Sequence, residues 1–316
     1  MRRAQLAWLG AVTLSVVTYA GAARADAPAA ADTEPEAAVP AGEGAVEGEE
    51  EIEEIEEAGP LVVSAPDAWR ASDWPQADRA VNVLTPTPTR AGALLMVIDH
   101  RTWQAFSDDP VDDFLGFDSG GLKIGLALRY GVLEDLDVGA LRLNNGVEAF
   151  DVYELDARWR ALSQEEHAVD LALRLGGTWF AQERAEDASG TFAQLAVARR
   201  FGPHLSLGAG LAFHSEATGD RKRDVDEAWA LAVPAWAEVR FTPSVAWRLE
   251  AVFNVAGYGA EWPALSTSVA FMTHRHSFSF VVSNTQYTSA DGLVSNSWRG
   301  LEDLIIGFSI TRELQL

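Results

Sequence analysis

The chain has 316 residues, no cysteine and a formal net charge of -23. The missing cysteines exclude disulfides, c-type haem attachment, cysteine zinc sites and a lipid-modified N-terminal cysteine. The strong negative charge argues against sequence-independent binding of nucleic acid, which depends on clustered Lys and Arg, so we expect no nucleic-acid partner.

Residues 1–25 are predicted to be an export signal. Arg2 and Arg3 give a positive start, and residues 6–20 are mainly apolar. Residues 23–25 (Ala-Arg-Ala) form a small-x-small cleavage site. An uncleaved membrane anchor is the alternative, although the apolar run is short for one. We therefore expect cleavage after Ala25 and export from the cytoplasm.

Residues 26–59 are predicted to be a disordered acidic spacer. They contain 13 acidic residues and no Lys, Arg or aromatic residue. Such a segment buries too little apolar surface to offset its ordering entropy, and its like charges repel each other. The alternative is a binder of divalent cations or of a basic partner. Residues 60–90 contain five prolines and are predicted to be an extended connector.

Residues 91–316 are predicted to form the folded domain, an all-β, transmembrane, antiparallel up-and-down β-barrel of about 12 strands. Apolar and polar residues alternate, and period two marks a strand with two different environments. Many candidate strands have about ten residues, the length of a tilted strand that crosses a bilayer. The candidates are residues 91–101, 121–130, 136–143, 149–161, 168–179, 191–201, 204–214, 227–240, 244–254, 264–272, 276–286 and 303–313.

The candidate strands are joined alternately by short turns and by mostly longer loops, which is typical of outer-membrane barrels. An even number of strands places both ends of the barrel on the short-turn side. We therefore expect the outer membrane of a Gram-negative bacterium as the location and a periplasmic acidic spacer. The expected partners are outer-membrane lipid, the barrel-assembly machinery and small polar solutes.

Two features favour an apolar face that points to lipid rather than inward. Aromatic residues collect near the predicted strand ends, where a membrane interface would lie; they are Tyr130, Phe150, Trp159, Trp179, Phe192, Phe201, Phe213, Trp229, Phe241 and Trp247. The opposite face is too charged and too small for a dry core. A soluble exported β-rich binding protein is the alternative architecture.

The charged residues on the inward face are the predicted functional lining of the lumen. They are Lys123, Arg129, Glu154, Asp156, Arg158, Arg160, Asp170, Arg174, Glu238, Arg240, Arg248 and Glu250. Opposite charges in a narrow lumen would be partly desolvated and would pair. One interpretation is a selectivity lining for a small polar solute, in a narrow pore or transporter. The other is a polar network that plugs and stiffens a surface scaffold.

The last two predicted strands form the hairpin that closes the barrel. The segment from Leu304 to Arg312 is expected to pair antiparallel with the segment from Gly92 to His100, with Phe308 toward lipid. Pro234 lies inside the eighth candidate strand and cannot donate a ladder hydrogen bond, so we expect a bulge or local widening there.

Several stretches resemble a family of exported bacterial β-barrel proteins that is known only as a domain of unknown function. They are Phe114–Asp118, Leu126–Val132, His276–Phe280, Ser283–Gln286 and Ile306–Arg312. The resemblance covers roughly residues 90–316. It implies an outer-membrane barrel and supplies neither a substrate nor catalytic residues.

Other candidate sites are weaker, and we expect no enzyme activity, no cofactor and no bound metal. A membrane-embedded hydrolase of the phospholipase type is an alternative, but the adjacent His214 and Ser215 would point to opposite faces of a strand. His274 and His276 could bind a metal, and a polar turn with solvated imidazoles is the preferred interpretation. The aspartates between Asp108 and Asp118 lack the spacing of a calcium loop.

Overall fold

The computed structural model describes residues 78–103, 105, 122–145, 150–182, 188–217, 228–273 and 275–316. All of them belong to one compact unit, Val63–Leu316. The predicted signal, the acidic spacer, the aspartate-rich loop and His274 lie outside the described residues. In the described part of the chain, no helix is long and apolar enough to cross a membrane.

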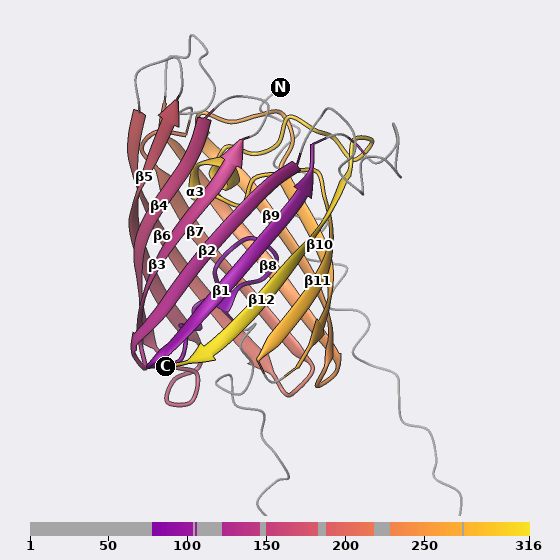
Figure 1. Cartoon of the computed structure of the whole chain (residues 1–316). Coiled ribbons are helices and arrows are strands. Elements are labelled where there is room, and N and C mark those ends of the chain that lie inside the picture. Colours follow the sequence, from indigo (N-terminus) through magenta and orange to yellow (C-terminus); the bar gives the residue numbers. More distant parts are fainter. Residues whose placement is uncertain are drawn as a thin grey trace, which may run out of the picture. The chain divides into compact units, whose positions relative to one another are not determined.

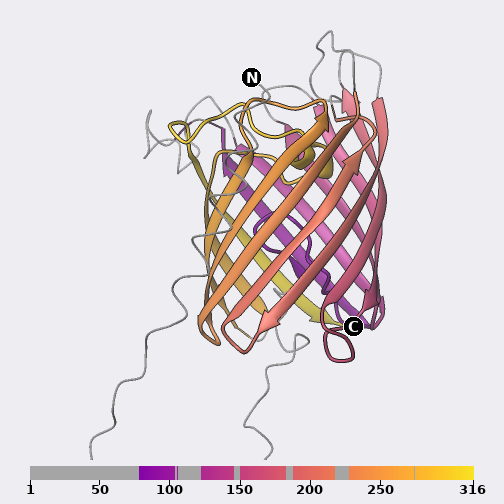
Figure 2. The same cartoon turned by 180° about the vertical axis from the view of Figure 1, so that it is seen from behind.

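Across the described residues, twelve antiparallel strands close into one barrel, in which each strand pairs with its neighbours in sequence and β1 pairs with β12 (Figures 1 and 2). The expected fold class is therefore confirmed. The strands are β1 (Ala93–Thr102), β2 (Leu122–Leu133), β3 (Leu136–Asn145), β4 (Phe150–Leu162), β5 (Asp170–Gln182), β6 (Ala188–Phe201), β7 (Leu205–His214), β8 (Ala230–Thr242), β9 (Val245–Gly257), β10 (Ala264–Met272), β11 (His276–Ser283) and β12 (Ile305–Gln315).

The outer surface of the barrel is apolar. Leu126 and Leu155, for example, are 46% and 56% exposed, whereas their strand neighbours Ala127 and Glu154 are buried. An exposed band of large hydrophobic residues on every other position is what a membrane barrel presents to lipid. The alternation read from the sequence therefore has its apolar side outside.

Most of the predicted aromatic positions lie on this outer surface. The exposed ones are Tyr130, Trp159, Trp179, Phe201, Phe213, Trp229, Phe241 and Trp247. The prediction that Phe192 also lies at the membrane interface is wrong. It is buried on the luminal side of β6, where its ring stacks on that of His214 at 5.9 Å and lies 4.5 Å from the Arg174 guanidinium. The side chain of Phe150 lies outside the described residues.

The seam between β1 and β12 closes the barrel as predicted, with an antiparallel ladder from Ala93↔Gln315 to Arg101↔Gly307. Phe308 pairs with His100, at the end of the expected partner segment rather than at its middle. The offset arises because β12 continues almost to the C-terminus, where the Leu316 N–H donates to the Gly92 carbonyl at 3.1 Å. Phe308 points outward and stacks on the His100 ring at 4.6 Å.

Pro234 interrupts the sheet locally. The β7–β8 ladder runs to Ala209↔Ala235 and resumes at Ala212↔Ala232 without a change of register. The two pairs opposite Pro234 and Val233 are therefore missing from it. On the other side of β8, the register shifts between Leu231 and Ala232. The predicted irregularity is confirmed, and its cause is the absent N–H of proline.

Two segments enter the lumen, the second of them only in part, since its Trp298 and Leu301 are exposed. The first, residues 78–85, precedes β1 and is called the inner turn. The second, residues 284–304, joins β11 to β12, contains the short helix α3 (Ala290–Val294) and is called the inner loop. Figure 1 shows the indigo segment inside the barrel and α3 within the mouth opposite the C-terminus. Ala80 and Val83 of the inner turn share one buried cluster with Leu293 and Val294 of the inner loop.

Candidate functional site in the barrel lumen

The structure brings the predicted luminal residues together, but at different depths. Nine of the twelve are at most 9% exposed; they are Lys123, Arg129, Glu154, Asp156, Arg158, Asp170, Glu238, Arg248 and Glu250. Arg174 is slightly more exposed, with a side chain at 12%. Arg160 and Arg240 lie near the short-turn rim. Arg160 pairs with Asp135 of the β2–β3 turn at 2.6 Å, and Arg240 pairs with Glu238.

A ladder of alternating charges runs along the β2–β5 wall. Arg129 bridges Asp137 and Asp156, with 2.7 Å from Nη2 to an oxygen of each. Arg174 Nη2 donates to Asp156 at 2.8 Å and to Glu154 at 3.2 Å. Arg158 forms an ion pair with Asp137 at the end of the ladder away from Glu154. Each buried charge therefore has an opposite partner, which offsets its desolvation.

The residue order of β3 and β4 positions the side chains of this ladder. Glu154, Asp156 and Arg158 occupy every second position of β4, so all three point inward. Gly139 on the facing strand β3 makes room for the Arg129 guanidinium, because a Cβ at residue 139 would lie 2.4 Å from Arg129 Nη1.

The inner turn is bound to the barrel wall largely through amide groups. The backbone N–H groups of Val81, Asn82 and Val83 donate to one oxygen of Glu250 at 3.0, 2.8 and 2.8 Å. Arg158 Nη1 donates to the carbonyls of Asp78 and Thr85, each at 2.9 Å. Three N–H groups around one carboxylate form a nest, in which hydrogen bonds to a charge are roughly twice as strong as neutral ones.

Other strands hold the same turn at its edges. Gln194 donates to the Leu84 carbonyl at 2.9 Å. Arg101 donates to Asn82 Oδ1 at 3.1 Å, and Asn82 Nδ2 donates to Ser266 Oγ at 2.9 Å. Arg79 pairs with Asp99 at 3.0 Å. The turn is therefore tied to β1, β4, β6, β9 and β10, around most of the circumference of the barrel.

Asp78 is an exception within this well-paired segment. Its side chain is 2% exposed, and in the described part of the chain neither carboxylate oxygen has a hydrogen-bond partner. Burial raises the pKa of this carboxyl, while the positive charges of Arg79 and Arg158 oppose the rise. The inner turn therefore carries a buried acid that holds its proton more tightly than the same acid does in water.

The inner loop is held at the opposite mouth. Its Ala290 N–H donates to Glu154 Oε1 at 2.5 Å, and its Val294 carbonyl accepts from Asn254 Nδ2 at 2.9 Å. Lys123 Nζ lies 3.8 Å from the centroid of the Tyr287 ring. A cation over an aromatic face is attracted by the quadrupole of the ring. Lys123 therefore also contacts the inner loop.

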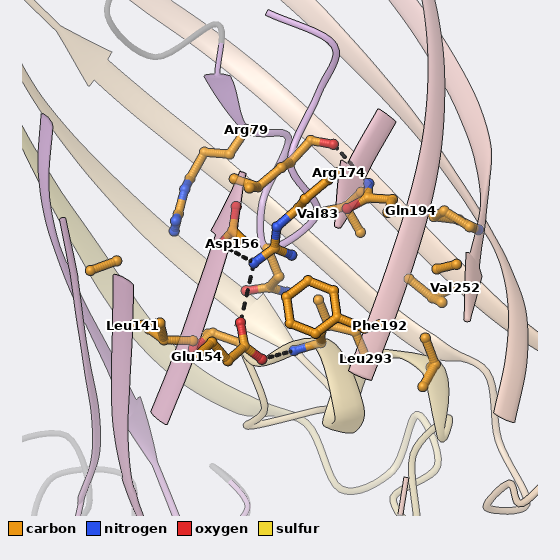
Figure 3. A pocket seen from close by; sticks show the side chains of 18 of the residues that line it. Arg79, Val83, Leu141, Glu154, Asp156, Arg174, Phe192, Gln194, Val252 and Leu293 are labelled. Carbon is orange, nitrogen blue, oxygen red and sulfur yellow. Dashed lines mark hydrogen bonds and ion pairs between the residues drawn. The ribbon is translucent and has the colours of Figure 1, made fainter. Parts of the chain in front are cut away.

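Two small cavities, each of about 50 Å³, lie on the two sides of the inner turn. The central one lies between the inner turn and the inner loop; its lining includes Asp99, Arg129, Glu154, Asp156, Arg174, Gln194 and Thr288. Figure 3 shows Arg174 directed at Asp156 and Glu154 in this cavity. The other cavity is lined by Asp170, Arg200, Glu238 and Arg240 near the short turns. Each has room for a few water molecules, and the inner turn separates them.

The adjacent His214 and Ser215 bind different partners in the structure. His214 Nδ1 accepts the Glu216 N–H at 3.1 Å, so its other nitrogen donates to Thr178 Oγ1 at 3.0 Å. Ser215 Oγ instead accepts the Thr191 N–H at 2.8 Å. Among the described residues, no three His, Cys, Asp or Glu side chains are grouped as a metal site.

Sequence reasoning missed several residues of the luminal site. Asp99, Arg101 and Asp137 lie on the inward positions of strands that were predicted, so the alternation itself was a sufficient signal for them. Asn82 and the backbone around it gave no signal. They act through amide groups, and every residue except proline carries the same backbone amide.

One family model matches most of the chain. The model of the family described as "Membrane bound beta barrel domain (DUF5777)" matches residues 76–314. The match begins before β1 and so includes the inner turn. No curated protein matches the chain.

Several solved structures are similar in fold. An outer membrane channel from Pseudomonas putida F1 has a TM-score of 0.48 and 11% identity, over 72% of this chain and 98% of that one. The NanC porin has a TM-score of 0.41 and 9% identity, over 70% and 100%. The toluene transporter TbuX from Ralstonia pickettii has 0.36 and 11%, over 77% and 96%. The fold described above rests on the strand pairing of this chain and not on these similarities.

Proposed function

The chain belongs to the membrane-bound β-barrel domain family whose model spans residues 76–314, and from this membership we propose that it is a gated outer-membrane channel for a small polar solute. The inner turn is the gate in this proposal. The short-turn side, where β1 begins and β12 ends, faces the periplasm, and so does the predicted acidic spacer.

The observation that carries the proposal is the pair of cavities divided by the inner turn. Both are lined in part by acidic and basic side chains, which favour water and polar solutes. The inner turn, which separates the two cavities, consists of eight residues that precede β1. It can therefore leave the lumen without breaking any strand-to-strand pairing. The inner loop, in contrast, is covalently anchored at both ends by β11 and β12.

Release of the inner turn has a definite cost. It would leave Glu250 without its N–H donors and Arg158 without two carbonyl acceptors. A hydrogen bond to a charged group contributes about 1.5–3 kcal/mol, so the seated state is strongly favoured until water or a solute replaces these contacts. The channel is therefore expected to be closed most of the time and to open briefly.

Conductance of the full-length barrel in a planar lipid bilayer tests the proposal. Wild-type barrels should show rare openings, and Glu250→Gln should raise the open fraction because the amide receives the three N–H groups less strongly than a carboxylate. The matched control is Glu238→Gln. This luminal carboxylate contacts Arg240 and Arg248 rather than the inner turn, so its substitution should leave the open fraction unchanged.

A reversible lock tests whether the inner turn is the gate. Asn82→Cys with Ser266→Cys places two thiols at positions whose side chains are in contact, in a chain with no other cysteine. A short, reducible thiol crosslinker should abolish the openings, and a reductant should restore them. If no variant conducts before or after reduction, the channel is refuted and the charge ladder supports the alternative, a plugged surface scaffold.

A further inference from the structure

The wall around the inner turn recognises peptide groups. Five described wall side chains bind the turn through amide atoms: Glu250, Arg158, Gln194, Arg101 and Ser266. Three of these contacts are made to the side-chain amide of Asn82, by Arg101, Ser266 and Oε1 of Glu250. Oε2 of Glu250 and the Arg158 guanidinium instead bind backbone groups that any peptide carries.

The wall presents its hydrogen-bond acceptor and its hydrogen-bond donors on different strands. Glu250 on β9 accepts three successive N–H groups, those of residues 81–83. Arg158 on β4 and Gln194 on β6 donate to the carbonyls of residues 78, 84 and 85. A bent peptide presents N–H groups on one side and carbonyls on the other, which matches this separation.

The seated inner turn shields two charged groups of the wall from water. With the turn in place, Glu250 and Arg158 are 5% and 1% exposed, and they form charge-assisted hydrogen bonds to its backbone. When the inner turn leaves, a ligand that supplies the same pattern stabilises the open state. A sugar or an inorganic ion does not offer three N–H donors in series, whereas a peptide of a few residues does.

We propose that the lumen holds a binding site for short peptides, which the inner turn occupies in cis when the barrel is closed. The proposal rests on the proposed function, because an external peptide reaches the site only if the inner turn can leave. It also names short peptides as the solute of the channel. A bound peptide competes with the inner turn and so keeps the gate open.

Competition for the site is measured with the full chain carrying Val83→Cys. The Val83 side chain is buried in the apolar cluster and makes no wall hydrogen bond of its own. Its thiol would be the only one in the protein, and its reaction with a charged thiosulfonate reagent reports release of the turn. The probe is the acetylated and amidated peptide Asp-Arg-Ala-Val-Asn-Val-Leu-Thr, which has the sequence of residues 78–85.

The matched control peptide is methylated on the three backbone nitrogens that correspond to residues 81–83. The unmodified peptide should accelerate labelling by about tenfold at saturating concentration, the ratio that corresponds to 1.4 kcal/mol. The methylated peptide should have no effect, because it lacks the donors for Glu250. In the double variant with Glu250→Gln, the difference between the two peptides should shrink, because the amide oxygen accepts N–H groups less strongly than the carboxylate does.

Equal effects of the two peptides, or no effect of either, overturn the peptide site. This result is separable from failure of the channel. If Glu250→Gln conducts ions but the peptides do not compete, the channel stands and the peptide site falls. If only the unmodified peptide competes but no variant conducts, the peptide site stands and the channel falls.

Discussion

Glu154 and Arg158 lie four residues apart on the luminal face of β4, and each binds a different one of the two inserted segments. Glu154 accepts the N–H of Ala290 in the inner loop at 2.5 Å. Arg158 donates to two carbonyls of the inner turn at 2.9 Å. Asp156 lies between them in the sequence and joins them through the arginines of the charge ladder. One strand therefore contacts both of the inserted segments.

Arg158→Gln should strongly destabilise the barrel and loosen the inner turn. The substitution removes a cation from a fully buried pair with Asp137 and leaves two carbonyls without their donor. Breaking a buried pair from one side costs about 3–5 kcal/mol. Guanidinium unfolding in detergent, followed by tryptophan fluorescence, measures the change.

Arg160→Gln is the control for that experiment, since it makes the same chemical change two residues further along β4. Arg160 pairs with Asp135, whose side chain is 54% exposed. The expected loss is about 0–1 kcal/mol, as for surface ion pairs. Equal losses for the two variants would contradict a buried ladder.

Leu173→Arg should impair assembly into the membrane, whereas Ala172→Ser should be tolerated. Leu173 points outward from β5, and its neighbour Ala172 is buried on the luminal side. Arginine on the lipid face costs about 2–4 kcal/mol near the midplane of the bilayer. The fraction of heat-modifiable, folded barrel on a cold gel measures assembly. Similar fractions for both variants would argue against the assigned orientation.

In the proposed channel, the open fraction should rise with pH because of Asp78. Burial raises the pKa of its carboxyl in the seated inner turn above the ordinary value of 3.8. The seated state therefore binds the proton more tightly than the released state, and its advantage falls as pH rises from that ordinary value through the raised one. Single-channel recordings across this range measure the effect.

Asp78→Asn should flatten the pH profile and keep the open fraction low, because the neutral amide cannot ionise. Asp135→Asn, at an exposed turn position, is the control and should retain the wild-type profile. A profile that survives Asp78→Asn would assign the pH dependence to another group.

Tyr287→Leu should weaken the attachment of the inner loop more than Tyr287→Phe does. Both substitutions remove the hydroxyl group, but only phenylalanine keeps the aromatic face that lies 3.8 Å from Lys123 Nζ. A desolvated cation–π contact contributes about 2 kcal/mol. A double-mutant cycle with Lys123→Met, followed by thermal unfolding, isolates this contribution. A coupling energy near zero would remove the cation–π contact as a stabilising interaction.

The strands were largely predictable, because alternation reports a local property of the chain. The candidate at 264–272 coincides with β10 (Ala264–Met272), and the first candidate, 91–101, differs from β1 by one or two residues at each end. The largest difference at the last hairpin is the end of β11, which stops at Ser283 rather than at 286. The regular ladder ends there because Asn284 Oδ1, in place of a backbone carbonyl, accepts the Leu265 N–H at 2.7 Å, while Asn284 Nδ2 donates to the Pro263 and Arg299 carbonyls.

The candidate site was predictable only in part. The alternation along the strands placed Arg129, Asp156 and Arg174 on the inward face, and these side chains do form ion pairs. The partner of Arg158 is Asp137 on the adjacent strand, and this choice depends on the register of the β3–β4 ladder, in which the two residues are directly opposite. Register follows from all the pairings around the closed barrel, and no single segment encodes it.

The sequence by itself determined a barrel of about twelve strands with an apolar exterior and a charged interior, because the side-chain period of a strand is local and shows directly in residue order. Only the tertiary structure decided that residues 78–85 and α3 lie inside the barrel. The reason is physical: Glu250 and Arg158 hold the turn through backbone amides. Backbone amides are common to almost every residue, so their pairing becomes specific only after the wall has closed around them.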